Sequence, residues 1–364
     1  MGLSVRIASF NFENFFSRPT LLNRDNATVA PLLTDLAELE TDLARPVYDA
    51  ATKARILENW KKLSKYLTLR ENKGKLFSGS GAKRKVSAVG AGSWAGSVEM
   101  KRESIPDEGQ ENTLRVVAAV DADILCTVEM DDRYTLRHVA TSPRLPKPTR
   151  FSSAMLIDGN DDRGIDVGVL SKAPITELRS HVDDRDADGV VFSRDCLEAK
   201  VELPGGRDVH VLANHFKSQG YGSQAGNDAK RLRQSERVAE ILRRHDLENE
   251  YVVVAGDLNA DRDAPNASSL GPLLSHPHLV DVLRVDLGAG DDWAYYYGGK
   301  KQRLDYLFCS TALASRLDRT RIERRGMWNL AKITQGAETP FPQVTGATTA
   351  ASDHAAIVAE FDLP

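Results

Sequence analysis

Short apolar runs rich in β-branched residues recur along the chain and constrain its fold more than any other feature. They cover residues 5–10, 124–128, 167–170, 209–213, 251–255, 304–308 and 356–361. Helical spacing of apolar residues precedes two of these runs, over residues 114–120 and 229–245. In the second helix, one apolar stripe consists of Leu232, Val238, Ile241 and Leu242. Because strands alternate with both tight turns and helices, the pattern predicts a mixed α/β layered fold.

Residues 17–110 interrupt this rhythm. Their first half has apolar residues at helical spacing: Leu32, Leu33, Leu36, Leu39, Leu43, Ile56, Leu57, Trp60, Leu63 and Leu67. Residues 74–97 are instead rich in Gly, Ser and Lys, which predicts a flexible loop. We therefore expect a single domain over residues 1–364 that carries residues 17–110 as a helical and Gly/Lys-rich insertion.

Charge is distributed unevenly along the chain. The 364 residues have a formal net charge of −4, which by itself argues against a protein that binds nucleic acid over a broad basic surface. Residues 53–102, however, contain 13 Lys and Arg against 3 Glu, a net charge of +10, so the remainder is near −14. The small net charge therefore does not exclude a nucleic-acid substrate. Any such binding is expected to be local, salt-sensitive and dependent on residues 53–102.

Cysteine usage and the N-terminal sequence bear on the compartment. Cys126, Cys196 and Cys309 stand singly among apolar neighbours, so no disulfide framework or zinc ribbon is indicated, and buried thiols in a reducing compartment are expected. The chain opens without a basic segment followed by an apolar one, and no apolar run approaches the roughly 18 residues of a membrane span. We therefore expect a cytoplasmic protein with no membrane partner. The sequence does not indicate the oligomeric state.

Polar residues stand where the apolar runs begin or end. They are Asn11, Glu129, Asn214-His215, Asp257 and Asn259, Asp305, and Asp353-His354. Because ligands of α/β sheets lie where strand ends meet loops, these groups are expected to form a single site with four carboxylates, two histidines and three amides. Hard oxygen ligands without cysteine favour Mg²⁺ or Mn²⁺ over zinc.

The spacing of these residues adds detail to the expected site. Asp353 and His354 are adjacent on a strand, so their side chains point in opposite directions. We expect Asp353 to face a metal and His354 to be oriented by another carboxylate, for which Asp305 is the best candidate. Asp257 and Asn259 are two residues apart and can face one cavity. A His–Asp pair beside Mg²⁺ can deprotonate water for attack on phosphorus.

Six blocks in a fixed order carry a resemblance to a known family. They are Phe10-Asn11, Glu129, Asn214-His215-Phe216-Lys217-Ser218, Gly256-Asp257-Leu258-Asn259-Ala260, Arg303-Leu304-Asp305-Tyr306 and Ser352-Asp353-His354. Over residues 1–16 and 111–364 the chain resembles the endonuclease/exonuclease/phosphatase superfamily with its deoxyribonuclease-like fold. The segment after His215 is most similar to the bacterial nuclease branch. The resemblance implies an α/β (α+β) fold, a four-layer α/β-sandwich in which helices flank two packed mixed β-sheets.

The resemblance also implies roles for the metal and base residues. Glu129 would be a metal ligand with Asn11 beside it, and His354 would activate water while Asp305 holds it. Two departures from the family pattern stand out. Val128 occupies a position where many members carry Gln, and the 94-residue insertion 17–110 is far longer than the usual connection. Because of this insertion, the sequence does not define which surface faces the substrate.

Further residues are implied to act on the phosphate. Asp257 and Asn259 would orient the nucleophile and the phosphate, and His215 would bind a phosphate oxygen or assist the leaving group. Lys217 is a candidate for substrate binding, with a solvated loop lysine as the alternative. Arg163, just before the strand at residues 167–170, could bind a phosphate bidentately; the alternative is a surface turn arginine.

Two other patterns carry weaker hypotheses. Aromatic residues 293 and 295–297, followed by Lys300, Lys301 and Arg303, could stack bases and contact a phosphate backbone, or form the core of a hairpin. The second pattern places Asp184, Asp186, Asp188 and Asp195 at the spacing of a calcium-binding loop. For this segment, an acidic β-turn is the alternative.

Together these features predict a hydrolase of ester bonds. We expect a divalent-metal-dependent phosphodiesterase that hydrolyses nucleic acid, with DNA as the expected polymer. One alternative is an enzyme of the same fold acting on a phosphoinositide, a phospholipid such as sphingomyelin, or a small phosphate ester. Another is a non-catalytic nucleic-acid-binding module, although the presence of all six blocks argues against it. The sequence does not distinguish endonucleolytic from exonucleolytic cleavage.

Overall fold

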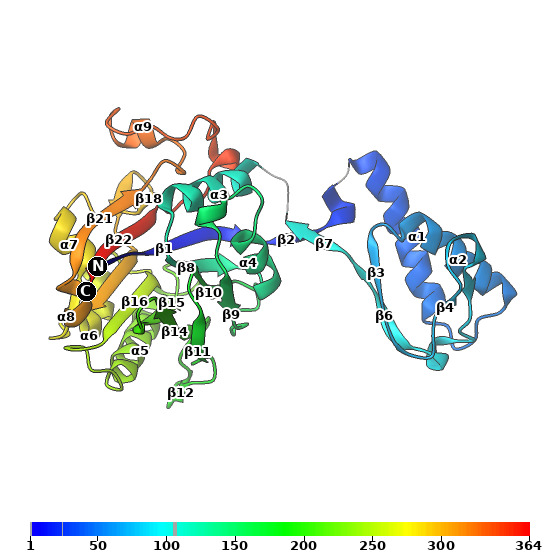
Figure 1. The fold of residues 1–364 in the computed structure, drawn as a ribbon. Coiled ribbons are helices and arrows are strands. Elements are labelled where there is room, and N and C mark those ends of the chain that lie inside the picture. Colours follow the sequence, from blue (N-terminus) through cyan, green and yellow to red (C-terminus); the bar gives the residue numbers. More distant parts are fainter. Residues whose placement is uncertain (1, 24, 105–107) are drawn as a thin grey trace. The chain divides into compact units, whose positions relative to one another are not determined.

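A computed structural model of the chain describes residues 2–23, 25–104 and 108–364 (Figure 1). The chain divides into a main unit, Met1–Phe16 with Pro106–Pro364, and an insert unit, Ser17–Ile105. Each unit has its own hydrophobic core. The insert unit ends before residue 110 because helix α3 (Glu108–Val120) packs on the main unit.

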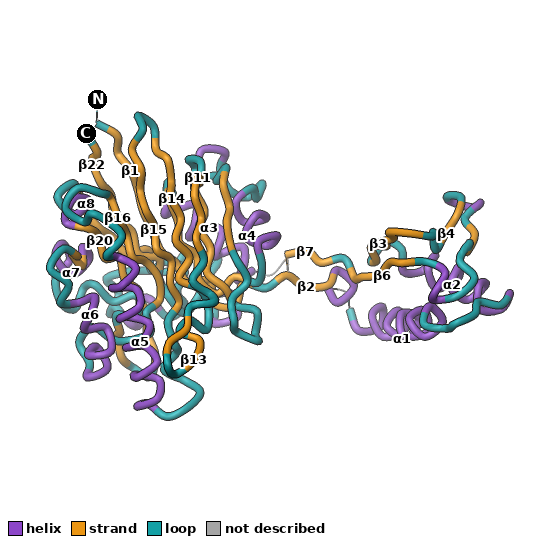
Figure 2. The backbone as a smooth tube through the Cα atoms, turned by 90° about the horizontal axis from the view of Figure 1, so that it is seen from below, coloured by secondary structure: helices purple, strands orange, loops and turns teal. Residues whose placement is uncertain are grey.

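Two mixed β-sheets form the centre of the main unit (Figure 2). Across the first sheet the order is β21 (Leu317–Glu323), β22 (Ala356–Leu363), β1 (Leu3–Phe15), β8 (Ile124–Met130), β10 (Asp166–Ser171) and β9 (Ser153–Leu156). Across the second it is β11 (Ile175–Arg179), β14 (Cys196–Leu203), β15 (Arg207–His215), β16 (Tyr251–Asp257), β20 (Asp305–Ser310) and β17 (Leu279–Asp281). The predicted apolar runs all contribute to these strands.

Side-chain alternation along the strands builds the layers. In β15, Val209, Val211 and Ala213 face the first sheet, whereas Leu212 faces the helix α5 (Gln224–Leu242). Helix α6 (Gly271–Leu274) covers the same outer face, and α3 with α4 (Arg133–Ala140) covers the outer face of the first sheet. The main unit is thus an α/β-sandwich with helices outside two packed sheets, as predicted.

Shorter elements connect these layers. They are η4 (Lys147–Thr149), β12 (Arg185–Asp186), β13 (Gly189–Val190), η5 (Pro265–Leu270), α7 (Val282–Leu287), β18 (Tyr295–Tyr297), β19 (Lys300–Gln302), α8 (Thr311–Ala314), α9 (Leu330–Ile333) and η6 (Ala347–Thr349). One detail of the predicted α5 stripe is wrong, because Leu232 is exposed while Val238, Ile241 and Leu242 are buried.

The insert unit combines two helices with short antiparallel strand pairs. Its elements are β2 (Ser17–Pro19), η1 (Thr20–Asn23), α1 (Asn26–Leu43), α2 (Ala50–Leu63), β3 (Leu67–Lys73), β4 (Phe77–Ser78), η2 (Gly81–Lys83), β5 (Lys85–Val86), η3 (Ala91–Ser93), β6 (Ala95–Met100) and β7 (Arg102–Ser104). The side chains of Asp25 and Asp49 cap α1 and α2 by accepting hydrogen bonds from backbone N–H groups. The prediction of a flexible loop over residues 74–97 is wrong, because β4 pairs with β5 and β6 pairs with β3.

The cysteines are buried and unpaired, as expected from their apolar surroundings. In the part of the chain that the structure describes, no helix is both long enough and apolar enough to cross a membrane.

Candidate active site

Strand direction gathers the polar strand ends at one edge of the sandwich. The parallel pairs β1–β8 and β15–β16 end there, while the antiparallel strand β20 begins there, with Asp305 opposite Asp257. A cavity of about 550 Å³ opens at this edge. Its lining includes the predicted residues Glu129, Arg163, His215, Asp257, Asn259, Asp353 and His354.

His354 and Asp305 form a buried pair at the base of this cavity. His354 Nδ1 lies 2.8 Å from Asp305 Oδ2. The backbone of His354 donates to Ser352 Oγ, which in turn donates to the carbonyl of Asn11, so the turn before β22 is fixed. Burial opposes protonation of His354, but the charges of Asp305 and Asp353 outweigh it and raise the pKa of the imidazole well above its ordinary value. The orienting contact expected from the sequence is therefore present.

Asp257 is a crowded carboxylate beside this pair. Its Oδ2 accepts a hydrogen bond from Asn11 Nδ2 at 3.2 Å, and its Oδ1 accepts one from the backbone N–H of Asn259 at 2.9 Å. His354 Nε2 and His215 Nε2 each lie 3.9 Å from Asp257 Oδ2. Burial, followed by the nearby carboxylates, raises the pKa of Asp257 to about 7 against the opposing charge of His354.

Backbone conformation explains why a glycine precedes Asp257. Gly256 has φ +135°, and a Cβ there would lie 1.9 Å from the carbonyl oxygen of Asn214 on the neighbouring strand. Glu129 and Asn259 also have positive φ, at 63° and 54°. Such conformations are costly for residues other than glycine and cluster at functional sites. The side chains of Glu129 and Asn259 both line the cavity.

Glu129, Asp353 and Glu13 line another part of the cavity. Glu129 Oε2 accepts from the backbone N–H of Asn14 at 2.9 Å, and its Oε1 lies 3.8 Å from His215 Nε2. Glu13 Oε2 accepts from the backbone N–H of Asp353 at 2.9 Å. Partial desolvation and the charge of Asp353 raise the pKa of Glu13 to about 7. Glu13 is not among the residues predicted from the sequence, although its position two residues after Asn11 was an available signal.

The donor set fits a hard divalent cation. Glu13, Glu129, Asp257 and Asp353 all line the cavity, and burial, followed by neighbouring carboxylates, raises the pKa values of Glu13 and Asp257. Asn11 is placed differently from the expectation of a ligand. Its Oδ1 accepts from the backbone N–H of Glu13 at 3.0 Å and its Nδ2 donates to Asp257, so it holds the Asp257 carboxylate and the backbone of Glu13.

Two arginines, Arg163 and Arg194, bring positive charge to the same cavity. Arg163 lines the cavity, as predicted, and its guanidinium bonds both oxygens of Asp161, at 3.0 and 2.9 Å. Arg194 is almost fully buried, lines the same cavity and lies 3.0 Å from the same carboxylate. The sequence analysis missed Arg194, since no motif or periodicity distinguishes its loop.

Lys217 does not line the cavity. Its ammonium group donates to the carbonyl oxygens of Gly220, at 2.9 Å, and Tyr221, at 3.1 Å. The structure thus places Lys217 where it holds the loop that carries Tyr221. Direct contact between Lys217 and the substrate therefore stays a prediction.

The aromatic segment is divided between the cavity and the core. Tyr295 and Tyr297 line the cavity, with stacked rings 6.3 Å apart, whereas Trp293 is buried. Arg303 is also buried and bonds Asp281 and Asp292, each at 2.8 Å, so it has a structural part. Within this aromatic and basic segment, Tyr295 and Tyr297 are the residues that line the cavity.

The predicted calcium ligands do not converge. The Asp186 carboxylate pairs with Arg233 on α5, and Asp184 lies 3.1 Å from His181 Nδ1. Asp195 is buried, where its Oδ1 accepts the backbone N–H of His181. Asp188 also lies on the Arg233 side, 3.8 Å from its guanidinium. Because each carboxylate is directed to a basic group or to the backbone, the structure does not support the calcium-loop hypothesis.

Comparison with known proteins agrees with this geometry. The sequence model of the Endonuclease/Exonuclease/phosphatase family matches residues 106–354. The chain belongs to this family. Enzymes of the family hydrolyse phosphodiester bonds and are typically dependent on divalent metals.

Individual relatives are more distant. A phospholipase C of Staphylococcus aureus is 29% identical over 173 residues, covering 43% of this chain and 48% of that protein. The chain therefore spans about half the length of the curated relatives it matches. The crystal structure of an endonuclease/exonuclease/phosphatase from Bacteroides vulgatus aligns over 100% of both chains at 12% identity and a TM-score of 0.52, which shows the shared fold. One from Beutenbergia cavernae aligns at 20% identity over 71% of this chain and 66% of that one, with a TM-score of 0.48.

Proposed function

We propose that the protein is a divalent-metal-dependent phosphodiesterase that cleaves nucleic acid, with DNA as the polymer. The reaction type rests on one observation, the buried His354–Asp305 pair at the base of an acidic cavity. A histidine held in this way can take a proton from a water molecule, while the cavity provides carboxylates for a cation.

The chain's own residues account for the proton transfer. With Nδ1 bonded to Asp305, His354 presents Nε2 to the cavity, 3.9 Å from both Asp257 Oδ2 and Asp353 Oδ1. A water molecule between these groups would lose its proton to Nε2 as its oxygen attacks phosphorus. Asp257, fixed by Asn11 and Asn259, would orient that water.

Other side chains would bind the phosphate and the metal. Burial and the charge of Arg194 hold the pKa of His215 well below its ordinary value, so its imidazole is neutral and can donate a hydrogen bond to a phosphate oxygen or to the leaving oxygen. Arg163 would contact the phosphate. Glu129 and Asp353, with Glu13 beside them, would hold a Mg²⁺ or Mn²⁺ ion, which offsets the charge that develops on the phosphate.

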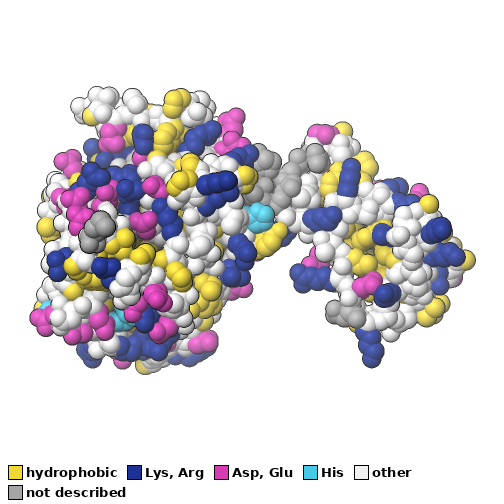
Figure 3. Space-filling model, viewed as in Figure 1, with side chains coloured by type: hydrophobic (Ala, Val, Ile, Leu, Met, Phe, Trp, Pro, Cys, Tyr) yellow, Lys and Arg dark blue, Asp and Glu magenta, His cyan; other side chains and the backbone are white. Residues whose placement is uncertain are grey.

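Two features support a nucleic-acid substrate. Tyr221 and Tyr297 line the cavity and are 83% and 70% exposed, so their rings are accessible to bases of a bound nucleic acid. Lys and Arg side chains, dark blue in Figure 3, are spread over the insert unit, whose residues 53–102 have a net charge of +10. Such a surface attracts a polyanion through counterion release.

A second candidate substrate is a phospholipid. The relative from Staphylococcus aureus is called a phospholipase C, and its match gives a specific reason to test lipid phosphodiesters. The same His354–Asp305 pair would serve this reaction, because the bond cleaved is again a phosphate ester.

A substrate panel distinguishes these proposals. Plasmid DNA, single-stranded DNA, RNA, sphingomyelin vesicles, a phosphodiester dye and a phosphomonoester dye would each be incubated with Mg²⁺, Mn²⁺ or EDTA. We expect cleavage of DNA and of the diester dye, and loss of both activities in EDTA. Cleavage of vesicles without DNA would establish the lipid substrate instead. Hydrolysis of the monoester alone would contradict the phosphodiesterase proposal.

The insert unit offers a test of polymer binding. Lys73, Lys75, Lys83 and Lys85 are exposed there, and within the described residues none forms an ion pair. Changing all four to serine should raise KM for DNA about 10-fold at low salt, since each lost phosphate contact weakens binding. Cleavage of the diester dye should not change.

The matched control for this experiment changes exposed lysines of the main unit, Lys147→Ser with Lys332→Ser. Initial rates at two salt concentrations would be compared for all three proteins. Equal losses on DNA and on the dye would show that the insert unit does not act through polymer binding.

A further inference from the structure

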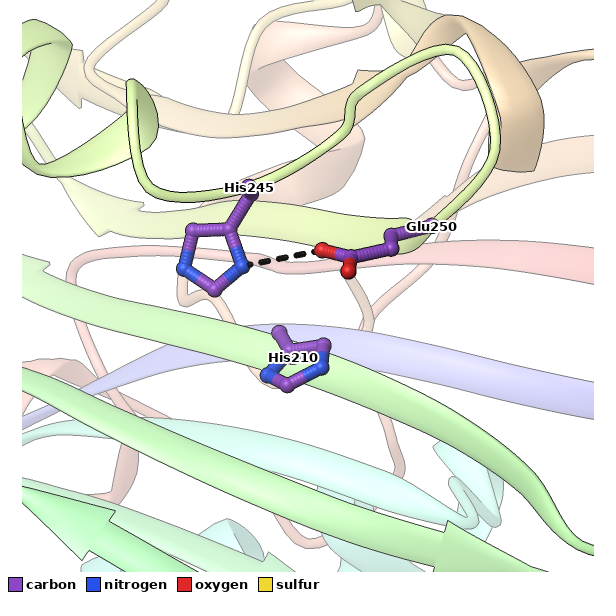
Figure 4. Close-up of side chains that lie close together, drawn as sticks. All are labelled: His210, His245 and Glu250. Carbon is purple, nitrogen blue, oxygen red and sulfur yellow. Dashed lines mark hydrogen bonds and ion pairs between the residues drawn. The ribbon is translucent and has the colours of Figure 1, made fainter.

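A second group of metal-ligating side chains lies in the main unit, away from the acidic cavity. It consists of His210 on β15, His245 in the turn after α5, and Glu250 immediately before β16 (Figure 4). One ligand atom from each lies within 4.8 Å of the other two, beside a cavity of about 330 Å³. His210 precedes His215 by five residues, which places this group about 16 Å along β15 from the active-site edge.

The separation between His245 and Glu250 suits a bound metal. His245 Nδ1 lies 3.3 Å from Glu250 Oε2, the contact drawn as a dashed line in Figure 4. Two ligands at about 2.0–2.1 Å from a tetrahedral Zn²⁺ are about 3.4 Å apart. These two atoms therefore already have the spacing of a zinc ligand pair.

A carboxylate outside this group orients His245. Glu198 Oε1 lies 3.2 Å from His245 Nε2, so a proton on Nε2 leaves the lone pair of Nδ1 directed at Glu250. Burial opposes ionisation of Glu198, but hydrogen bonds from His181 and His245 and the charge of Arg244 hold its pKa well below its ordinary range. A carboxylate that accepts from the second nitrogen of a histidine is the usual support of a metal-binding imidazole.

His210 is the third ligand of the group. Within the described residues its side chain forms no hydrogen bond, and its ring lies 4.8 Å from that of His245. Burial, with the charge of His245, lowers the pKa of His210. A neutral imidazole is the form that binds a metal.

Two basic groups around the cavity, Arg244 and Lys200, are already paired with carboxylates. Arg244 lies 2.5 Å from Glu198, and Lys200 lies 3.1 Å from Glu177 and 3.0 Å from Asp208. Their positive charges are thus offset by carboxylates other than Glu250. Neither cation is paired with Glu250, whose Oε2 accepts a hydrogen bond from the backbone N–H of Asp246 at 3.2 Å.

We propose that His210, His245 and Glu250 form a zinc site, with water as the fourth ligand. Two imidazoles and one carboxylate favour Zn²⁺, whereas the oxygen donors of the acidic cavity favour Mg²⁺ or Mn²⁺. The three ligands join β15 to the turn between α5 and β16, which come together only in the folded chain. Zinc should therefore bind the folded state selectively and stabilise it.

Titration calorimetry with Zn²⁺ on the full chain, in excess Mg²⁺, tests this site. Wild-type protein should bind one more Zn²⁺ per chain than the His210→Asn variant. Zinc at about 100 times its Kd should raise the Tm of the wild type by about 5 °C, and not that of the variant. Since the acidic cavity is unchanged in both proteins, zinc bound there cancels in the comparison.

Two further variants complete the experiment. Glu250→Gln changes an exposed ligand and should lose the same zinc ion, which keeps the test decisive if His210→Asn folds poorly. His138→Asn, an exposed histidine on α4, is the control and should bind zinc as the wild type does. Unchanged stoichiometry and unchanged Tm shift in either ligand variant would overturn the three-ligand site. Phosphodiesterase activity in Mg²⁺ should be retained by His210→Asn.

Discussion

Replacing His354 with alanine is expected to lower kcat/KM for DNA cleavage by at least 10²-fold, the scale on which loss of a general base reduces an enzymatic rate. The imidazole is the group that Asp305 orients at 2.8 Å and whose Nε2 points into the acidic cavity. Alanine removes the proton acceptor but leaves the carboxylates that would hold the metal. Binding of DNA should therefore persist while turnover is lost.

The measurement is an initial rate on plasmid DNA and on a diester dye at saturating Mg²⁺. Because His354 is buried, its replacement also removes packing, so His354→Gln should be assayed beside it as a variant of similar volume. Both variants need a Tm close to that of the wild type. His276→Ala, outside the cavity, provides the control histidine. Cleavage within tenfold of the wild-type rate in a folded variant would remove His354 from its proposed role.

Much of the fold and of the site is visible in the sequence because it depends on local pattern. A buried strand requires a short apolar run, and the residue at which the run ends is where the strand meets the loop. Asp257 and Asp305 stand at such ends and are register partners of the β16–β20 pair. The antiparallel pairing that brings them together follows from the layered fold, so their proximity could be predicted without coordinates.

Other features depend on contacts distant in sequence and could not be predicted in this way. Arg194 lines the cavity and forms an ion pair with Asp161, 33 residues away in the sequence. No local sequence pattern predicts this contact. The ammonium group of Lys217 donates hydrogen bonds to loop carbonyl oxygens such as that of Gly220, so its charge does not face the cavity. In the insert unit, β3 pairs with β6 across residues whose composition alone favours a loop. Long-range pairing overrides local propensity there.

The sequence predicts that the cavity is acidic, but not all the carboxylates that line it or how they are held. Several carboxylates at strand ends imply a cation, and the structure adds that Glu13 belongs to this set through its bond to the backbone of Asp353. It also shows that Asn11 is engaged at both ends of its amide, by Asp257 and by the backbone of Glu13. Through these two bonds Asn11 fixes the positions of Asp257 and Glu13. Assigning each residue the role of its counterpart in the family does not predict this function.

Replacing Asp305 with asparagine should reduce kcat about 10²-fold and also shift the pH dependence of the reaction. The pKa of His354 is raised above 6.5 because Asp305 and Asp353 outweigh the effect of burial. His354 must be neutral to accept a proton, so activity in the wild type should rise with pH through that raised pKa. Asparagine removes the negative charge of Asp305. The pKa of His354 should fall, and the acid limb of the profile should move to lower pH.

A profile of kcat against pH, at saturating Mg²⁺ and DNA, separates this positioning role from a structural one. A variant that is only destabilised would lose activity without moving the limb, because the environment of the remaining folded molecules is unchanged. Asp318→Asn serves as the control, since Asp318 is exposed on β21 and lies outside the cavity. Its limb should coincide with that of the wild type. If the limb of Asp305→Asn also stays in place while the protein remains folded, Asp305 does not set the proton affinity of His354, and the base must be sought elsewhere among the cavity residues.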